Sequence, residues 1–336
     1  MTDFLVGGYS ADLGGEALGV GRARTAADGR LEYLGVAVEV PSPSWISIAA
    51  DGAVFAALEG TAELAVLGTV GALRLIDRVP IGGRLPCHLA VTTDSVITAC
   101  YGDGAIAVHR RGHGTGESPA VDGPTELLTA EGTGPLPAQD GPHAHHVLVW
   151  DERHVLTVDL GTDLLHVHRW EDGPDAAELV RVDSLPMPPG TGPRDLLRLP
   201  DGRLAILGEW SRELVIAEPS GSTFEIVQIE ALPGATDASQ ASALGLSHDG
   251  RFLYAGLRGA DRIAILGLDA DELRPVGWAP SGGHWPRHLV VDADTLHVAN
   301  QLSSTVTSFQ IGLDGSLTSL GEPAPVPSPT VLVAVP

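Results

Sequence analysis

The sequence predicts an all-β fold, a seven-bladed β-propeller that forms a single domain over residues 1–336. Three observations lead to this prediction. A three-strand pattern recurs along the chain, its copies are spaced as propeller blades are, and the two termini carry the strands that the pattern otherwise lacks. Each blade is expected to be a four-stranded antiparallel sheet. The 42 Gly and 25 Pro residues suit many short strands joined by tight turns.

The repeated pattern is an apolar run, an Asp-containing turn, a second β-rich run that ends in a polar residue, a tight turn and a third apolar run. The clearest copies cover residues 193–217, 242–266 and 286–309, and weaker copies cover 45–67, 86–109 and 142–168. The central turn acids are Asp51, Asp94, Asp151, Asp201, Asp249 and Asp294, at intervals of 43, 57, 50, 48 and 45 residues. Propeller blades repeat every ~40–50 residues, so the length predicts about seven blades, one more than the six copies.

The termini are expected to supply the seventh blade. Residues 326–335 have the character of an innermost strand, and residues 4–10 have that of the next strand. Residues 16–24 and 31–40 are expected to be the two outer strands. A blade shared by both ends removes the exposed sheet edges. The Gly- and Pro-rich segments 112–141 and 186–192 are predicted to be loops on one face.

The charge balance excludes several classes of partner. With 43 acidic and 20 basic residues the net charge is −23, so nucleic acid and anionic membranes are poor partners. A small anionic metabolite can bind only where arginines gather. The basic residues are all Arg, which excludes chemistry that needs a Lys amine. We expect no cofactor, and we expect a monomer or a weak homodimer.

Neither a signal peptide nor an apolar run of ~20 residues is visible. Cys87 and Cys100 are too few to form a disulfide framework, so a cytoplasmic location is expected. The two thiols fall at the start of one strand and the end of its neighbour, and we expect them to be close, partly buried and inert. A nucleophilic thiol activated by His88 is the alternative.

In a propeller, the starts of the first strands and the ends of the second strands lie on the same face. The first-strand starts are His88, His145, His146, Arg194, Arg287 and His288, and the second-strand ends are Glu59, Cys100, Tyr101, Asp159, Glu209, Arg258, Asn300 and Gln301. Convergent polar groups of this kind are typical of a ligand site. The repeat therefore predicts a site at one mouth of the channel.

Some of these residues have a structural alternative. The acids of the central turns, Asp201, Asp249 and Asp294, are expected to satisfy turn backbone, and Arg203 and Arg251 are expected to be surface turn residues. Asp159 and Asn300 fit a structural role and a substrate contact equally well. Arg194 and Arg287 each follow a Pro at the start of a strand, and a buried cation needs a partner, so a functional role is favoured for both.

The segment His143-Ala144-His145-His146 is the most unusual local feature. Strand alternation places His143 and His145 on one side and His146 on the other. Two histidines on one side suit a metal, but no further ligand spacing supports one, so no metal site is predicted. An acid–base or oxyanion-side role is favoured for His145. The remaining histidines in this half are expected to be structural or solvated, namely His109, His113, His154, His166 and His168.

The segments Pro142–His145, Gly192–Arg194 and Val298–Val306 resemble the seven-bladed β-propeller lactonases. That family includes the propeller type of 6-phosphogluconolactonase and is similar to the carboxy-muconate lactonizing enzymes of fungi. The resemblance covers nearly the whole chain and implies a catalytic set of His145, Glu209, Arg194 and Arg258. The sequence departs from the family at Ala243-Leu244, where a Glu is usual, and at Cys100-Tyr101, where Asn-Tyr is usual.

Three functions remain open. The first is metal-independent hydrolysis of a small anionic sugar lactone, with His145 and Glu209 as acid and base and Arg194 and Arg258 at the oxyanion. In this hypothesis the substrate contacts are Arg287, His143, His88, Asn300, Asp159 and Glu59. The second is a cyclase or isomerase of a carboxylated unsaturated metabolite. The third is a non-catalytic propeller that binds a ligand or peptide.

Overall fold

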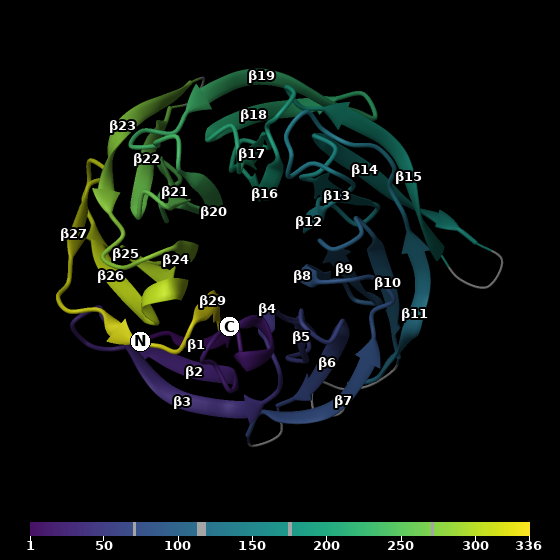
Figure 1. Cartoon of the computed structure of the whole chain (residues 1–336), viewed down its shortest axis with the longest axis horizontal. Helices are drawn as coiled ribbons and strands as arrows, with labels where there is room; N and C mark the ends of the chain where they lie inside the picture. Colours follow the sequence, from purple (N-terminus) through teal and green to yellow (C-terminus); the bar gives the residue numbers. More distant parts are fainter. Residues whose placement is uncertain (70–71, 113–118, 174–176, 270–271) are drawn as a thin grey trace. The chain divides into compact units, whose positions relative to one another are not determined.

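The computed structural model describes residues 1–69, 72–112, 119–173, 177–269 and 272–336, and it consists of antiparallel sheets with two short 3₁₀ helices (Figure 1). The helices are η1 (Ala11–Leu13) and η2 (Gln301–Ser303). The sheet that both termini build has the order β29-β1-β2-β3, with bounds Pro329–Ala334, Asp3–Gly8, Gly19–Thr25 and Leu31–Glu39. In this sheet the last strand of the chain pairs with the first, as the sequence predicts.

Six further sheets follow in chain order, each with four consecutive strands. The first three are β4–β7 (Pro43–Ile48, Val54–Leu58, Glu63–Gly68, Arg74–Pro80), β8–β11 (Pro86–Val91, Ser95–Cys100, Ile106–Arg111, Val121–Leu128) and β12–β15 (Ala144–Val149, His154–Asp159, Leu164–Asp172, Ala177–Pro186). The next two are β16–β19 (Pro193–Arg198, Leu204–Gly208, Glu213–Ser220, Thr223–Ala231) and β20–β23 (Gln240–Leu246, Phe252–Arg258, Arg262–Leu268, Leu273–Pro280). The last is β24–β27 (Pro286–Asp292, Thr295–Asn300, Thr305–Ile311, Leu317–Ser319), where β28 (Ala324–Pro325) also pairs with β26. The fold is therefore a seven-bladed β-propeller.

The described chain divides into two compact units. The first unit contains Met1–Ser42, Leu197–Ala217 and Ile226–Pro336, and the second contains Pro43–Leu196 and Glu218–Glu225. Each unit has its own apolar core between consecutive sheets. In the second unit, Phe55 and Leu64 of one blade pack with Leu89 and Val96 of the next. Among the described residues no helix is long and apolar enough to span a membrane.

The turn acids have the structural role that the repeat predicts. Asp201 and Asp249 each accept a hydrogen bond from the backbone N–H two residues later, at 2.9 and 3.1 Å. Each also pairs with the guanidinium of that same residue, Arg203 or Arg251, at 2.7 Å. The turn thus fixes its own arginine, and the structural role predicted for both acids is confirmed. The expected surface position is confirmed for Arg251, whereas the Arg203 side chain is only 13% exposed.

The expected loop at residues 112–141 is wrong in part. Strand β11 (Val121–Leu128) lies within it and forms the outer edge of its blade. The strand is solvent-exposed on most of its positions and includes a Gly and a Pro, so it lacks the apolar alternation by which strands are predicted. Residues 113–118, which include His113, lie outside the described residues.

Three histidines are buried in strands with neutral hydrogen-bond partners. Burial lowers the pKa of His166 and His168 from 6.5 to about 3 and that of His297 to about 4. Thr157 Oγ1 lies 2.9 Å from Nε2 of His168, and Ser308 Oγ lies 2.9 Å from Nδ1 of His297. Burial therefore keeps the rings neutral in the folded state, and the hydroxyls give them hydrogen-bond partners.

We predict that the protein loses stability as the pH falls from about 6.5 toward 3. In that window the unfolded chain binds protons that the buried rings of the native state do not, so each histidine adds a slope of up to about 1.4 kcal/mol per pH unit. Urea unfolding between pH 7 and 4 measures the slope. His297→Gln should reduce this slope by up to about 1.4 kcal/mol per pH unit, the contribution of one histidine. His248→Gln, which replaces an exposed histidine in a turn, is the control. An unchanged slope in His297→Gln contradicts the prediction.

Candidate functional site

A β-bulge occurs at the start of the innermost strand in six blades. One extra residue interrupts the pairing with the second strand in β4, β8, β12, β20, β24 and β29. The extra residues are Ser44, Cys87, His145, Arg287 and Thr330, with Ser242-Ala243 opposite one residue in β20. Arg194 follows Pro193 at the start of β16, the same place in the repeat. Because a bulge redirects a side chain out of the regular alternation, it singles out these positions.

The bulge modifies the expected alternation of the histidines in the second unit. Strand β12 begins at Ala144, so His143 lies in the preceding loop, and His145 is the bulged residue. Both rings nevertheless approach the same aromatic side chain. The ring of His143 stacks on Tyr101 with centroids 4.5 Å apart, and that of His145 meets Tyr101 edge-on at 6.2 Å. His143 Nδ1 also lies 2.7 Å from the Tyr101 carbonyl oxygen.

His146 has a carboxylate partner in the next blade. Its Nδ1 lies 2.6 Å from Oδ1 of Asp195, and both side chains are largely buried. On its other side His146 stacks on His88, with ring centroids 3.8 Å apart, and His88 in turn lies 4.0 Å from the ring of Trp45. These four residues occupy the position after the bulge, or its equivalent, in β4, β8, β12 and β16. They form a continuous polar and aromatic row.

Asp159 organises the loop that carries His143. Its Oδ1 accepts hydrogen bonds from the backbone N–H groups of His143, Gly161 and Thr162, at 2.9, 3.0 and 3.0 Å. The carboxyl is 1% exposed, and burial raises its pKa while the backbone donors oppose that shift. These contacts favour the structural alternative for Asp159. Its use as a substrate contact stays a prediction.

The other candidates of the second unit are also enclosed. Arg194 is 6% exposed at the second position of β16, and Glu59 is 8% exposed immediately after β5. Both cysteines are reduced thiols, as predicted, and they are buried more completely than the expected partly buried pair. Burial raises the pKa of the Cys100 thiol, and the nearby Cys87 raises it further. A thiol held neutral in this way is a poor nucleophile, which disfavours a catalytic role for Cys100.

In the first unit Glu209 and Arg258 form a buried ion pair. Arg258 Nη2 lies 2.8 Å from Oε1 of Glu209, and their side chains are only 5% and 9% exposed. The guanidinium also donates to the carbonyl of Ala241 at 3.2 Å and lies over the ring of Trp285 at 5.4 Å. The structure thus brings together two members of the catalytic set that the family resemblance implies.

Arg287 and Asn300 differ in their surroundings. Arg287 donates to the hydroxyl of Tyr9 at 2.6 Å, and its guanidinium carbon lies 4.8 Å from the Tyr9 ring centroid. Asn300 is fully buried. Its amide donates to Thr307 Oγ1 at 3.0 Å and to the backbone carbonyls of Ser281 and Val298. The structural alternative is therefore favoured for Asn300. The sequence analysis missed Tyr9 as a partner of Arg287, because the two residues are 278 positions apart and only the closure of the ring brings them together.

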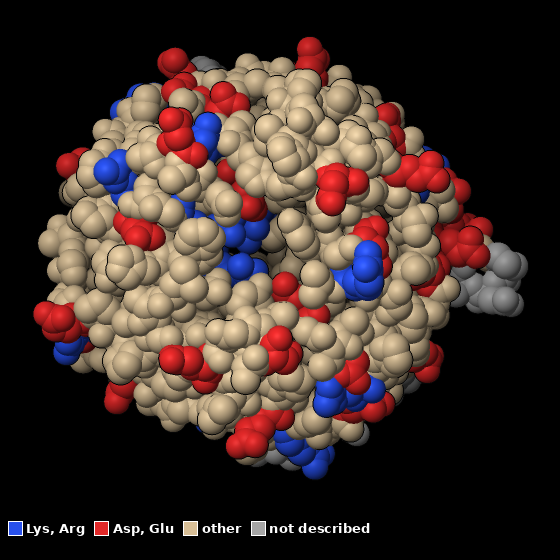
Figure 2. Space-filling model, in the orientation of Figure 1, with Lys and Arg blue, Asp and Glu red and all other residues tan. Residues whose placement is uncertain are grey.

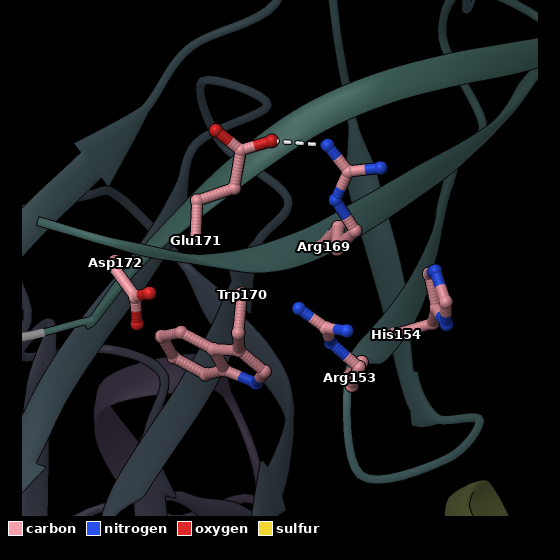
Figure 3. Close-up of a pocket in the computed structure, with 6 residues that line it drawn as sticks. All are labelled: Arg153, His154, Arg169, Trp170, Glu171 and Asp172. Atoms are coloured by element: carbon pink, nitrogen blue, oxygen red, sulfur yellow. Dashed lines mark hydrogen bonds and ion pairs between the residues drawn. The ribbon is translucent and has the colours of Figure 1, made fainter.

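Two cavities of the second unit lie at the other end of the strands. One of about 770 Å³ is lined by the turn acids Asp51, Asp94 and Asp151 and by Arg110 and Arg111. The other, of about 430 Å³, is a surface recess between Arg153, His154 and Trp170. Figure 3 shows its upper rim, where Arg169 pairs with Glu171. Neither cavity contains a residue of the predicted site.

Charged side chains of both signs lie on the face of the molecule that Figure 2 shows. Figure 2 shows acidic side chains scattered across the face in view, with arginines between them. Many of the exposed arginines lie beside a carboxylate of a neighbouring turn or strand, such as Arg24 with Asp3 and Arg274 with Asp269. Among residues 1–69, 72–112, 119–173, 177–269 and 272–336, no group of three or more His, Cys, Asp or Glu side chains is arranged to hold a metal ion.

Comparison with known proteins identifies the family. Residues 3–334 match the family described as "Lactonase, 7-bladed beta-propeller". The 6-phosphogluconolactonase of Bacillus subtilis (strain 168) is 29% identical over 313 residues, which cover 88% of this chain and 87% of that protein. A candidate 6-phosphogluconolactonase of Bacteroides fragilis NCTC 9343 has a similar structure, with a TM-score of 0.91, 26% identity and coverage of 100% of this chain and 98% of that chain.

The periplasmic gluconolactonase of Pseudomonas aeruginosa shares the fold, with a TM-score of 0.87, 24% identity and coverage of 100% of this chain and 99% of that chain. The family match spans all seven blades and both terminal strands of the shared sheet. The protein therefore belongs to the family of seven-bladed β-propeller lactonases.

Proposed function

We propose that the protein hydrolyses a small anionic sugar lactone, similar to 6-phosphogluconolactone, without a metal or another cofactor. The observation that carries the proposal is the placement of His145 and Arg287 at bulged strand starts, with Arg194 at the same place in the repeat. Bulges are frequent beside active sites, where they aim side chains. Membership of the lactonase family and the relatives named as 6-phosphogluconolactonases support the reaction type.

Each step of lactone hydrolysis has a candidate residue. Water must lose a proton as its oxygen attacks the carbonyl carbon, and His145 or Glu209 is the proposed base. The oxyanion that forms is stabilised by Arg194 and Arg258, since preorganised charge in an enclosed site is usually the largest contribution. The other of His145 and Glu209 then protonates the ring oxygen as the C–O bond breaks. The net reaction adds one water and yields a hydroxy acid.

The remaining candidates are proposed to bind the substrate. Arg287 is suited to a phosphate or carboxylate, since its planar guanidinium presents several donors. His143, His88 and Glu59 are proposed to contact the polyol. We further propose that the protein acts in the cytoplasm as a monomer or weak homodimer, on a free metabolite and not on nucleic acid or membrane.

The first prediction from the proposed function concerns Arg194. Arg194→Ala should lower kcat/KM for 6-phosphogluconolactone by at least about 10²-fold, the range for loss of one oxyanion donor. The variant should stay folded by circular dichroism. Arg251→Ala is the matched control, because it removes an equally charged side chain from an exposed turn. An Arg194→Ala protein with wild-type turnover refutes the assigned role.

The second prediction separates chemistry from stability at Glu209. Glu209→Ala leaves Arg258 buried without its carboxylate and should cost about 3–5 kcal/mol of unfolding free energy. Glu209→Gln keeps a hydrogen-bond acceptor beside Arg258, so it should remain much more stable and still lose turnover. Urea denaturation and lactone hydrolysis measured on both variants make the distinction. Full activity in Glu209→Gln excludes Glu209 as acid or base.

The third prediction concerns the choice of reaction. The enzyme should be assayed with gluconolactones, with and without phosphate, and with muconate-type acids. We expect the highest kcat/KM for the phosphorylated lactone. His145→Ala should abolish that turnover. Consumption of the muconate-type acids alone favours the cyclase or isomerase. Binding of these anions without turnover of any favours a ligand-binding propeller.

A further inference from the structure

The start of strand β12 is held from both neighbouring blades of the second unit. From β8, His88 presents its Nδ1 as acceptor for the backbone N–H of Val147, at 3.2 Å. From β16, Asp195 presents Oδ1 to Nδ1 of His146, at 2.6 Å. The bulged residue His145 lies immediately before this doubly held segment. Its backbone therefore has little freedom to shift.

The two imidazoles have opposite roles in these contacts. A carboxylate only accepts hydrogen bonds, so the Nδ1 of His146 carries the hydrogen. The Nδ1 of His88 accepts from a backbone N–H, so a neutral His88 carries its hydrogen on Nε2. The rings stack at 3.8 Å with an interplanar angle of 28°, and Trp45 covers the outer side of His88 at 4.0 Å. Each ring is thus fixed in tautomer and in orientation.

The pair of His146 and Asp195 links two residues of the proposed chemistry. His146 directly follows His145 in the chain, and Asp195 directly follows Arg194. One side-chain contact of 2.6 Å therefore links β12 and β16, the strands that carry the proposed base and the proposed oxyanion cation. The pair is largely buried, since His146 is 8% exposed and the Asp195 side chain is 15% exposed. A buried contact of this length is the stronger kind of hydrogen bond.

We infer that His146 and Asp195 are a positioning pair, which sets the distance and orientation between His145 and Arg194. The inference rests on the proposed lactonase function and adds two residues to it. Neither member needs to touch the substrate. The expected effect is large, because a misplacement of 1 Å at a reacting centre can reduce the rate by about 10²-fold.

The first test uses steady-state kinetics with the phosphorylated lactone. Asp195→Ala and His146→Phe should each lower kcat by about tenfold or more with KM within about twofold, since geometry and not binding is lost. The double variant should be no worse than either single one, because each change removes the same contact. Asp195→Asn retains an acceptor for Nδ1–H and should restore most of kcat.

The matched control is Asp151→Ala, in the turn between β12 and β13 of the sheet that contains His146. Asp151 also accepts from a histidine, with Oδ1 3.0 Å from Nδ1 of His154, but at the opposite end of the strands. It should leave kcat unchanged. Folded Asp195→Ala and His146→Phe proteins with wild-type kcat overturn the inference. So does an equal loss of kcat in the control.

A second test needs no substrate. Hydrogen–deuterium exchange in Asp195→Ala should be faster at residues 144–147 and 193–196, and unchanged at residues 286–288. Unchanged exchange at both segments overturns the positioning role, whatever the activity. A wild-type protein without lactonase activity defeats the proposed function instead, so the two failures are distinguishable.

Discussion

The extra residue at the start of six of the innermost strands is the constraint on which the rest of the site depends. An antiparallel pair with regular register alternates its side chains between two faces, and one inserted residue breaks that alternation. Here the break recurs at Ser44, Cys87, His145, Arg287 and Thr330. In β4, β8, β12 and β24 the residue after the bulge contacts the next blade through Trp45, His88, His146 and His288. The same local irregularity therefore sets one side chain apart at the bulge and uses its neighbour for packing between blades.

Contacts between innermost strands make this irregularity rigid. His88 accepts from the backbone of Val147 in the second unit, and His288 accepts from that of Leu332 at 3.3 Å in the first. Both donors stand two residues after a bulged position. Ser242 reinforces the first unit by donating to the Pro286 carbonyl at 2.6 Å. Because backbone groups buried without partners are costly, these side chains stabilise the strands that they reach.

The fold was predictable because its signal is periodic, whereas the site is only partly so. The nearly regular spacing of the turn aspartates predicts the number of blades. The apolar run at the carboxyl end predicts the strand that completes the blade begun at the amino end. The position of His145 and Arg287 at strand starts follows from the same repeat. The bulges leave no signature in composition, so alternation alone misplaced His143 relative to the strand. The pairing of His146 with Asp195 joins residues 49 apart and requires coordinates.

The position after the bulge shows how a repeated scaffold acquires an individual site. In the first unit that position is Leu244 in β20, His288 in β24 and Val331 in β29, so two of the three residues are apolar and buried. In β8, β12 and β16 it is His88, His146 and Asp195, which bond and stack with one another. The backbone geometry is shared, so the difference lies in the side chains alone. Function on such a fold is therefore decided by a few residues at equivalent places in the repeat, and in β8, β12 and β16 three successive blades carry a polar side chain at this place.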